Sequence, residues 1–277
     1  MEKAELLING SKGKSIQIDI SYIRTYQTKP VIVFCHGFKG FKNWGHFDLI
    51  AQYCALQGFV FVKFNFSHNG TTIEQPLDFA DLQAFGDNNF SIELNDLGFV
   101  LDHLETHADN YEVENREIYL IGHSRGGGIA ILKAQDDNRI KKLCTWASIK
   151  DVSDFFLHQN LEKWKAEGQI YTFNARTGQN MPLHFQLYEN YVMNKVRLDI
   201  QQAAKNIRIP WLIIHGTNDT SVPHTCAEQL HLWNPQSELT MIESADHTFG
   251  GKHPWMAAEL PEHTNTLLNK TISFLKK

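Results

Sequence analysis

The sequence predicts an α/β protein with a mostly parallel central sheet and helices on both faces. Short apolar, β-prone runs alternate with longer helix-like stretches along most of the chain. Such alternation is typical of parallel strands joined by crossover helices, because these strands are buried on both faces. The chain has 277 residues, and a single α/β domain of this length is ordinary. We therefore expect one domain over residues 1–277.

Each element follows from its local pattern. An alternating strand is expected at 15–22, after a Gly-rich turn at 10–13. Helices are expected at 47–57, at 91–105 and directly after Ser124. The buried strands are expected, in chain order, at 31–35, 59–66, 118–121, 143–148, 211–215 and 239–242.

One segment interrupts this alternation. The chain between Ser148 and Trp211 is much longer than a crossover requires. We expect residues 149–206 to form a cap insertion that lies over the site and contributes aromatic side chains to it; an ordinary decorated crossover is the alternative. The segment contains helical pieces at 152–167 and 184–194, and a hairpin whose strands at 169–173 and 179–183 flank a turn.

Composition excludes several classes of partner. With 26 basic and 31 acidic residues the net charge is −5, so we expect neither a nucleic acid nor an anionic membrane surface as a partner. No apolar run approaches the about 18 residues of a membrane span, and the first residues lack the apolar core of a signal peptide. Without an export signal, scattered cysteines are expected to be free thiols in a reducing cytoplasm. These are Cys35, Cys54, Cys144 and Cys226.

The most informative motif is Gly-His-Ser-Arg-Gly at 122–126. It follows the apolar run 118–121 and precedes a helix-like stretch. A serine on a sharp strand-to-helix turn exposes its hydroxyl, and the flanking glycines relieve crowding. The first N–H groups of the helix can hold a developing negative charge nearby. The pattern therefore indicates Ser124 as a nucleophile, whereas an incidental serine in a Gly-rich turn is the alternative.

A serine hydroxyl requires a neutral imidazole to accept its proton and a carboxylate to orient that imidazole. Asp219 follows the strand expected at 211–215, and His247 follows the strand at 239–242. The order serine, acid, histidine is the order expected for this kind of site. Three suitable residues, each placed after a strand, predict the triad Ser124, Asp219 and His247.

The other acids that could serve are Asp246, Asp151 and Asp154. Asp246 is adjacent to His247, and side chains of adjacent residues diverge. Asp151 and Asp154 follow the fourth buried strand. Clusters of His and Cys with metal-ligand spacing are lacking, so no metal is expected.

Two backbone N–H groups are needed to stabilise an oxyanion. Arg125, the residue after the nucleophile, supplies one of them. The other is expected from Phe38, in the loop after the strand 31–35, where Gly37 permits a close approach of the backbone. We expect His36 to make a structural hydrogen bond beneath this hole and not to act as a base.

These motifs resemble those of the α/β-hydrolase superfamily from about Pro30 to the C-terminus. The matching segments are 122–127, 215–219 and 245–249, and the loop 36–45 is similar to that of the dienelactone-hydrolase-like and cinnamoyl (feruloyl) esterase-like branch. The resemblance implies a serine ester hydrolase without metal or cofactor. Dienelactone hydrolases proper use a cysteine nucleophile, so their substrate is not carried over.

Three functions are compatible with these residues. The first is an esterase that cleaves small or aromatic acyl esters through an acyl-enzyme, with a small-molecule ester as its partner. The second is a serine peptidase or acyl-aminopeptidase of the same fold. The third is a non-catalytic binding protein, which would be expected to lack a triad residue. The sequence leaves the oligomeric state open.

Overall fold

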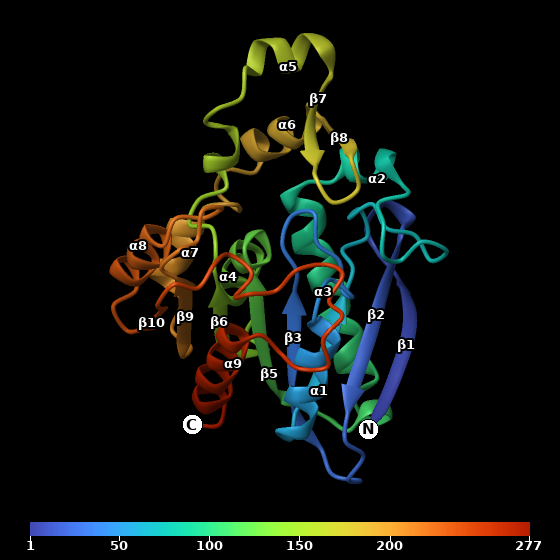
Figure 1. Ribbon diagram of the computed structural model, residues 1–277, viewed down its shortest axis with the longest axis vertical. Coiled ribbons are helices and arrows are strands. Elements are labelled where there is room, and N and C mark those ends of the chain that lie inside the picture. The colour runs from blue at the N-terminus through green and yellow to red at the C-terminus, as the bar shows by residue number, and fades with distance from the viewer.

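An eight-stranded sheet forms the centre of the protein (Figure 1). The computed structural model describes residues 1–277. The strands of the sheet are β1 (Glu2–Asn9), β2 (Ser15–Tyr22), β3 (Lys29–Cys35), β4 (Val60–Phe64), β5 (Val113–His123), β6 (Ile140–Trp146), β9 (Trp211–Gly216) and β10 (Glu238–Ile242). Their spatial order is β1-β2-β4-β3-β5-β6-β9-β10, in which β1 and β2 are antiparallel to their neighbours and the remaining pairs are parallel.

Helices cover both faces because side chains along each strand alternate between two cores. Val31 and Val33 pack into the core formed with α3, α4, α7 and α8, whereas Ile32 and Phe34 pack into the core formed with α1 and α9. The helices are α1 (Phe47–Leu56), α2 (Leu82–Asp87), α3 (Phe90–Thr106), α4 (Arg125–Asp136), α5 (Leu161–Glu167), α6 (Gln186–Met193), α7 (Ile200–Asn206), α8 (Thr225–Trp233) and α9 (Glu262–Leu275).

The predicted α/β class and mostly parallel sheet are confirmed. Two strand predictions need correction. No strand was expected at β1, an edge strand with charged residues at its start that pairs along its whole length with β2. The strand expected at 118–121 is only part of β5, whose polar first half extends the pairing with β3 to Lys29 and Val113.

The segment after β6 lies beyond the carboxyl ends of the parallel strands, at the top of Figure 1. The expected hairpin is present as β7 (Gln169–Asn174) paired antiparallel with β8 (Gln179–His184). The helix expected at 152–167 is instead divided into the 3-10 turn Ser153–Phe156 and α5. The division falls at Asn160, whose side chain accepts a hydrogen bond from the Lys163 N–H and begins α5.

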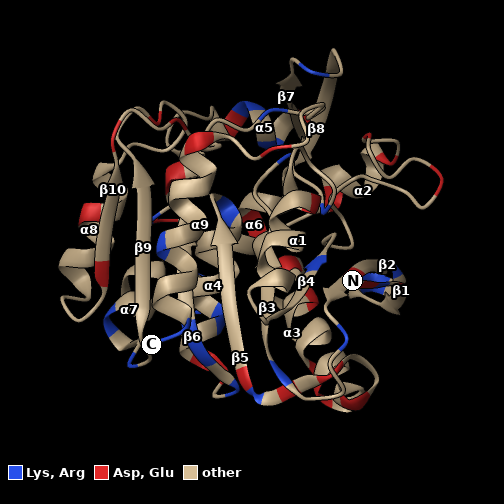
Figure 2. Cartoon of the chain, turned by 60° about the horizontal axis from the view of Figure 1, so that its bottom comes forward, with Lys and Arg blue, Asp and Glu red and all other residues tan.

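Charged residues of both signs are interspersed along helices and loops, while the central strands are largely uncharged (Figure 2). No helix combines the length and the apolar character that crossing a lipid bilayer requires. All four cysteines are buried free thiols.

Candidate active site

Ser124 occupies the turn between β5 and α4 in a conformation that side chains rarely adopt, with φ 57° and ψ −122°. Gly126 permits this turn to approach the neighbouring strand. A Cβ on Gly126 would lie 2.4 Å from the carbonyl oxygens of both Cys35 and His36. The half-buried side chain of Ser124 therefore lies at the carboxyl end of the sheet, where ligands of α/β proteins bind.

The structure brings Ser124, His247 and Asp219 together in one hydrogen-bonded chain. The Nε2 atom of His247 lies 3.0 Å from Ser124 Oγ, and its Nδ1 atom lies 2.7 Å from Asp219 Oδ2. The three residues come from loops after β5, β10 and β9 respectively. This arrangement orients the Nε2 lone pair of a neutral His247 towards the serine hydroxyl.

The carboxylate of Asp219 is fixed on both oxygens. Oδ1 accepts hydrogen bonds from the backbone N–H groups of Ser221 (2.8 Å) and Val222 (2.9 Å), and Oδ2 also accepts one from His215 Nε2 (3.1 Å). Burial alone would raise the pKa of Asp219, but the hydrogen bonds from His215, His247 and the backbone outweigh it and lower that pKa well below its usual range. The group is thus ionised and correctly oriented.

The other aspartates make local contacts. Asp246 Oδ1 accepts hydrogen bonds from the N–H groups of Thr248 (3.1 Å) and Gly250 (2.8 Å) and closes its own turn. Asp151 accepts a hydrogen bond from the Ser153 N–H at 2.7 Å. Asp154 pairs with Lys150 at 3.2 Å. None of the three hydrogen-bonds to the ring of His247.

The backbone N–H groups of Phe38 and Arg125 donate no hydrogen bond within the protein. Gly37 brings the first of these groups close to the serine, since a Cβ on Gly37 would lie 2.9 Å from Ser124 Cβ. His36 lies beneath this loop; its Nδ1 hydrogen-bonds to the carbonyl of Gly37 at 2.9 Å, and its Nε2 accepts from the N–H of Phe66 at 3.4 Å.

Burial keeps three histidines neutral because it penalises the charged imidazolium. It lowers the pKa of His36 to about 4, that of His46 to about 4 and that of His123 to about 3. His123 is a site residue that the sequence analysis did not identify. Its Nε2 donates a hydrogen bond to the backbone carbonyl of His247 at 2.8 Å, so the residue before Ser124 holds the loop that carries His247.

A second unpredicted feature is a buried charge cluster behind the loop that carries Phe38. Asp19 of β2 pairs with Lys42 and with Lys63 of β4, each at 2.7 Å. The N–H of Lys42 also donates to Asn65 Oδ1 at 2.7 Å. Burial would raise the pKa of Asp19, but the two lysines outweigh it and lower that pKa. The cluster fastens the loop to the antiparallel side of the sheet.

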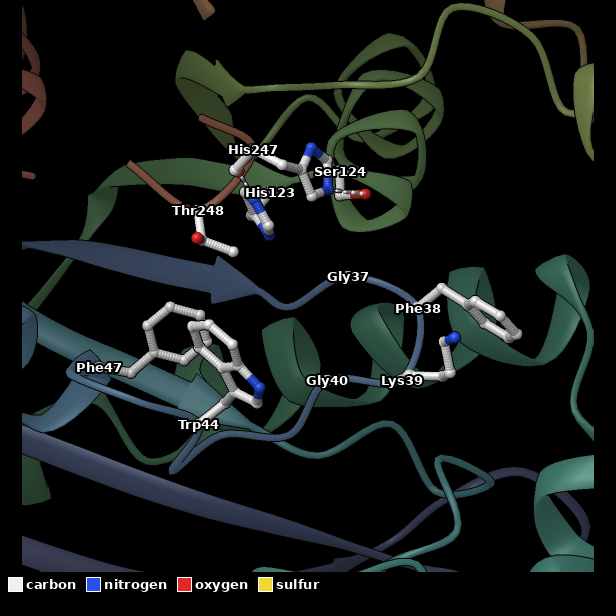
Figure 3. A pocket seen from close by; sticks show the side chains of 10 residues that line it. All are labelled: Gly37, Phe38, Lys39, Gly40, Trp44, Phe47, His123, Ser124, His247 and Thr248. Carbon is white, nitrogen blue, oxygen red and sulfur yellow. Dashed lines mark hydrogen bonds between the residues drawn. The ribbon is translucent and has the colours of Figure 1, made fainter. Parts of the chain in front are cut away.

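Two pockets lie near Ser124. The first, of about 110 Å³, has Ser124, His123 and His247 on one wall and Trp44 and Phe47 on the opposite wall (Figure 3). The second has a volume of about 220 Å³. Its lining consists of Phe90, Arg125, Ile149, Asp151, Asp154, Phe155, Ser221, Val222, Pro223 and Cys226.

Phe38 connects the two pockets. It lines the first, and its ring centroid lies 5.5 Å from that of Phe155 and 5.6 Å from the Cζ atom of Arg125, both of which line the second. The Phe38 side chain therefore lies at the boundary between the two pockets.

The comparison with family models is decisive for the class of protein. The model of the BD-FAE family matches residues 18–233, which is more than half of the chain. The chain belongs to the BD-FAE family. This membership confirms the predicted branch and the predicted enzyme class, a carboxylic ester hydrolase. A search of curated proteins found no match.

Solved structures share the fold of this BD-FAE member at low sequence identity. Est1E from Butyrivibrio proteoclasticus with bound ferulic acid is 16% identical, covers 98% of each chain and has a TM-score of 0.73. The α/β hydrolase GrgF from Penicillium sp. sh18 is 15% identical, with 100% of this chain and 98% of that chain covered and a TM-score of 0.72. A puromycin-hydrolyzing peptidase of Mycobacterium tuberculosis is 15% identical, with 99% and 39% covered and a TM-score of 0.66. These similarities confirm the α/β-hydrolase fold.

Proposed function

We propose that the protein hydrolyses carboxylic esters of small or aromatic acids through an acyl-enzyme on Ser124. The observation that supports this most directly is the hydrogen-bonded chain from Ser124 Oγ through His247 to Asp219. Each atom has the partner that nucleophilic catalysis by a serine requires.

The reaction has two halves. His247 Nε2 accepts the hydroxyl proton while Ser124 Oγ bonds to the carbonyl carbon, and the N–H groups of Phe38 and Arg125 stabilise the resulting oxyanion. The ester C–O bond then breaks, and the imidazolium returns its proton to the departing alkoxide. Water, deprotonated by His247, releases the acid and restores Ser124. Asp219 holds the ring in the required tautomer throughout.

Proton transfer assigns the two halves of the ester to the two pockets. The departing oxygen must lie beside His247 Nε2 to receive its proton. The first pocket is lined by both His247 and Ser124, so the alcohol group extends there. The acyl group then extends past Phe38 into the second, more apolar pocket, which suits an apolar acid.

Residues 149–206 act as a cap in this proposal, mainly through Phe155. Phe155 lines the second pocket, and Lys39 Nζ joins the hairpin to the Phe38 loop by donating to the carbonyl of Phe173 at 3.2 Å. Most cap aromatics have other surroundings: Trp164 is buried within the cap, and Tyr171 is exposed. The expectation of substrate-facing aromatics therefore depends on Phe155.

The replacement Ser124→Ala tests the nucleophile. We expect kcat for p-nitrophenyl acetate to fall about 10⁵–10⁶-fold, and labelling by a fluorophosphonate to disappear. Ser15→Ala, which replaces an exposed serine of β2, should change neither. An unchanged rate of ester hydrolysis in folded Ser124→Ala protein would refute the proposed function. Turnover of aminoacyl p-nitroanilides, measured in the same experiment, distinguishes ester hydrolysis from amide hydrolysis. Faster turnover of the anilides would favour the peptidase.

A further inference from the structure

The side chain of Arg125 is buried but only partly satisfied. Its guanidinium donates one hydrogen bond, from Nε to Glu93 Oε2 at 2.8 Å. A guanidinium carries five N–H donors, and its Nη groups donate no hydrogen bond within the protein. Nη2 is fully buried without an acceptor, whereas the equally unpaired Nη1 retains some accessible surface. Only 5% of the side chain is exposed, so these donors are largely withheld from bulk water.

The surroundings hold the guanidinium in place without using these donors. The ring of Phe90 lies 3.9 Å from Cζ and covers one face of the guanidinium. Glu93, whose side chain is 6% exposed, accepts from Nε and from Asn88 Nδ2 at 2.8 Å. Stacking and the ion pair therefore fix the plane of the Arg125 guanidinium. The unsatisfied buried donors still cost free energy, because they have lost water without gaining an acceptor.

The second pocket supplies the space for an acceptor. Arg125 and Phe90 both line it, together with apolar side chains and two carboxylates. The charge of Arg125 is balanced by Glu93, and that of Asp154 by Lys150 at 3.2 Å. Asp151 has no cationic partner within salt-bridge distance, so the pocket carries a negative excess that disfavours a bound anion.

We propose that Arg125 is a specificity-determining residue, whose unpaired Nη1 group donates to a neutral oxygen, of a hydroxyl, ether or carbonyl, on the acyl group in the second pocket. This inference rests on the proposed function, because it takes the second pocket as the acyl site. A substrate oxygen at this place satisfies donors that a plain hydrocarbon leaves unpaired. Sites built in this way discriminate strongly against analogues that lack the polar atom.

The experiment compares p-nitrophenyl heptanoate with isosteric esters in which an ether oxygen replaces one methylene at successive chain positions. In the wild type we expect kcat/KM for at least one ether to exceed that for heptanoate by about tenfold, since a hydrogen bond to a charged donor outweighs the lost apolar contact. The double variant Glu93→Gln/Arg125→Met removes donor and counter-charge together, which avoids an unpaired buried charge. There the ether should lose its advantage.

The single variant Glu93→Gln gives an opposite and independent result. It removes one negative charge and so cancels the negative excess of the acyl pocket, which should then accept a carboxylate more readily. We expect kcat/KM for the p-nitrophenyl monoester of adipic acid, relative to heptanoate, to rise about tenfold. An ether-to-heptanoate ratio that is the same in the wild type and the double variant would overturn the role of Arg125.

Calorimetric binding of the matching N-methyl amides to Ser124→Ala protein separates this inference from the proposed function. A preference for the ether amide that disappears when the double replacement is added supports the role of Arg125, even if Ser124→Ala still hydrolyses esters. Ester hydrolysis that depends on Ser124, combined with equal binding of ether and hydrocarbon amides, would leave the proposed function intact and refute the role of Arg125.

Discussion

Replacing Asp219 by asparagine tests the coupling between the acid and the histidine. The backbone N–H groups of Ser221 and Val222 bind Oδ1 at 2.8 and 2.9 Å, so they orient the new amide with its oxygen in that place. The NH₂ group must then replace Oδ2 at 2.7 Å from His247 Nδ1. It donates where the carboxylate accepted, and the ring therefore takes the tautomer with its proton on Nε2.

The expected magnitude follows from this tautomer. A ring protonated on Nε2 donates to Ser124 Oγ and cannot accept the hydroxyl proton. We expect kcat to fall about 10⁴-fold, which corresponds to about 5.4 kcal/mol. Stability should change much less, because His215 Nε2 retains its second acceptor, the carbonyl of Val222 at 2.9 Å. The loss is thus one of chemistry and not of folding.

The assay is the initial rate on p-nitrophenyl acetate, with urea unfolding measured on the same preparations. Asp246→Asn is the matched control, because the Asp246 carboxylate closes its own turn and hydrogen-bonds neither to the ring of His247 nor to Ser124. Its kcat should be nearly unchanged. A loss of less than about tenfold in folded Asp219→Asn protein, or a larger loss in Asp246→Asn, would refute the reasoning.

Three other predictions concern the surroundings of the site. Gly37→Ala should lower kcat about 100-fold, since its Cβ would lie 2.9 Å from Ser124 Cβ and displace the oxyanion donor; Gly98→Ala, which would meet only the flexible Lys133 Nζ at 3.1 Å, should keep full activity. Phe155→Ala should lower kcat/KM for aromatic acyl esters about tenfold relative to acetate, and an equal loss on both would show that Phe155 does not contact the acyl group. Burial lowers the pKa of several histidines in the folded state, among them that of His46 to about 4. As pH falls below about 6.5, these histidines bind protons in the unfolded state but not yet in the folded state, so the free energy of unfolding decreases until pH reaches the folded pKa. Each such histidine contributes up to about 1.4 kcal/mol per pH unit to this decrease. Urea unfolding of His46→Asn at several pH values should therefore give a slope of unfolding free energy against pH that is smaller by that amount.

The sequence predicts the parallel strands well because their signal is local. A strand buried on both faces must be apolar along its whole length, and such runs are visible without knowledge of the partners. β1 gives no such signal, since it is half exposed and its position depends on pairing with β2. The helix division at Asn160 was missed because a side-chain cap outweighs helical periodicity over so short a segment.

In the candidate site, the sequence does not predict hydrogen bonds between residues that are far apart along the chain. Placing Ser124, Asp219 and His247 together required only that carboxyl ends of parallel strands share one edge of the sheet. The bond from His123 to the carbonyl of His247 spans 124 positions, and the Arg125–Glu93 pair joins two helices. A single sequence contains no information on such pairings. The meeting of these three residues was therefore predictable, whereas the side chains that hold them in place were not.

The charge cluster around Asp19 also has a consequence for biosynthesis. Asp19 belongs to the second strand, which emerges from the ribosome early, but its partner Lys42 lies in the segment that carries the proposed oxyanion donor Phe38. The pairing of β2 with β4 brings Asp19 to Lys42, and this ion pair helps to fix that segment. Loss of the first strands by proteolysis would leave a buried lysine without its counter-ion. The maturation of the enzyme thus depends on residues that are remote from the reacting atoms.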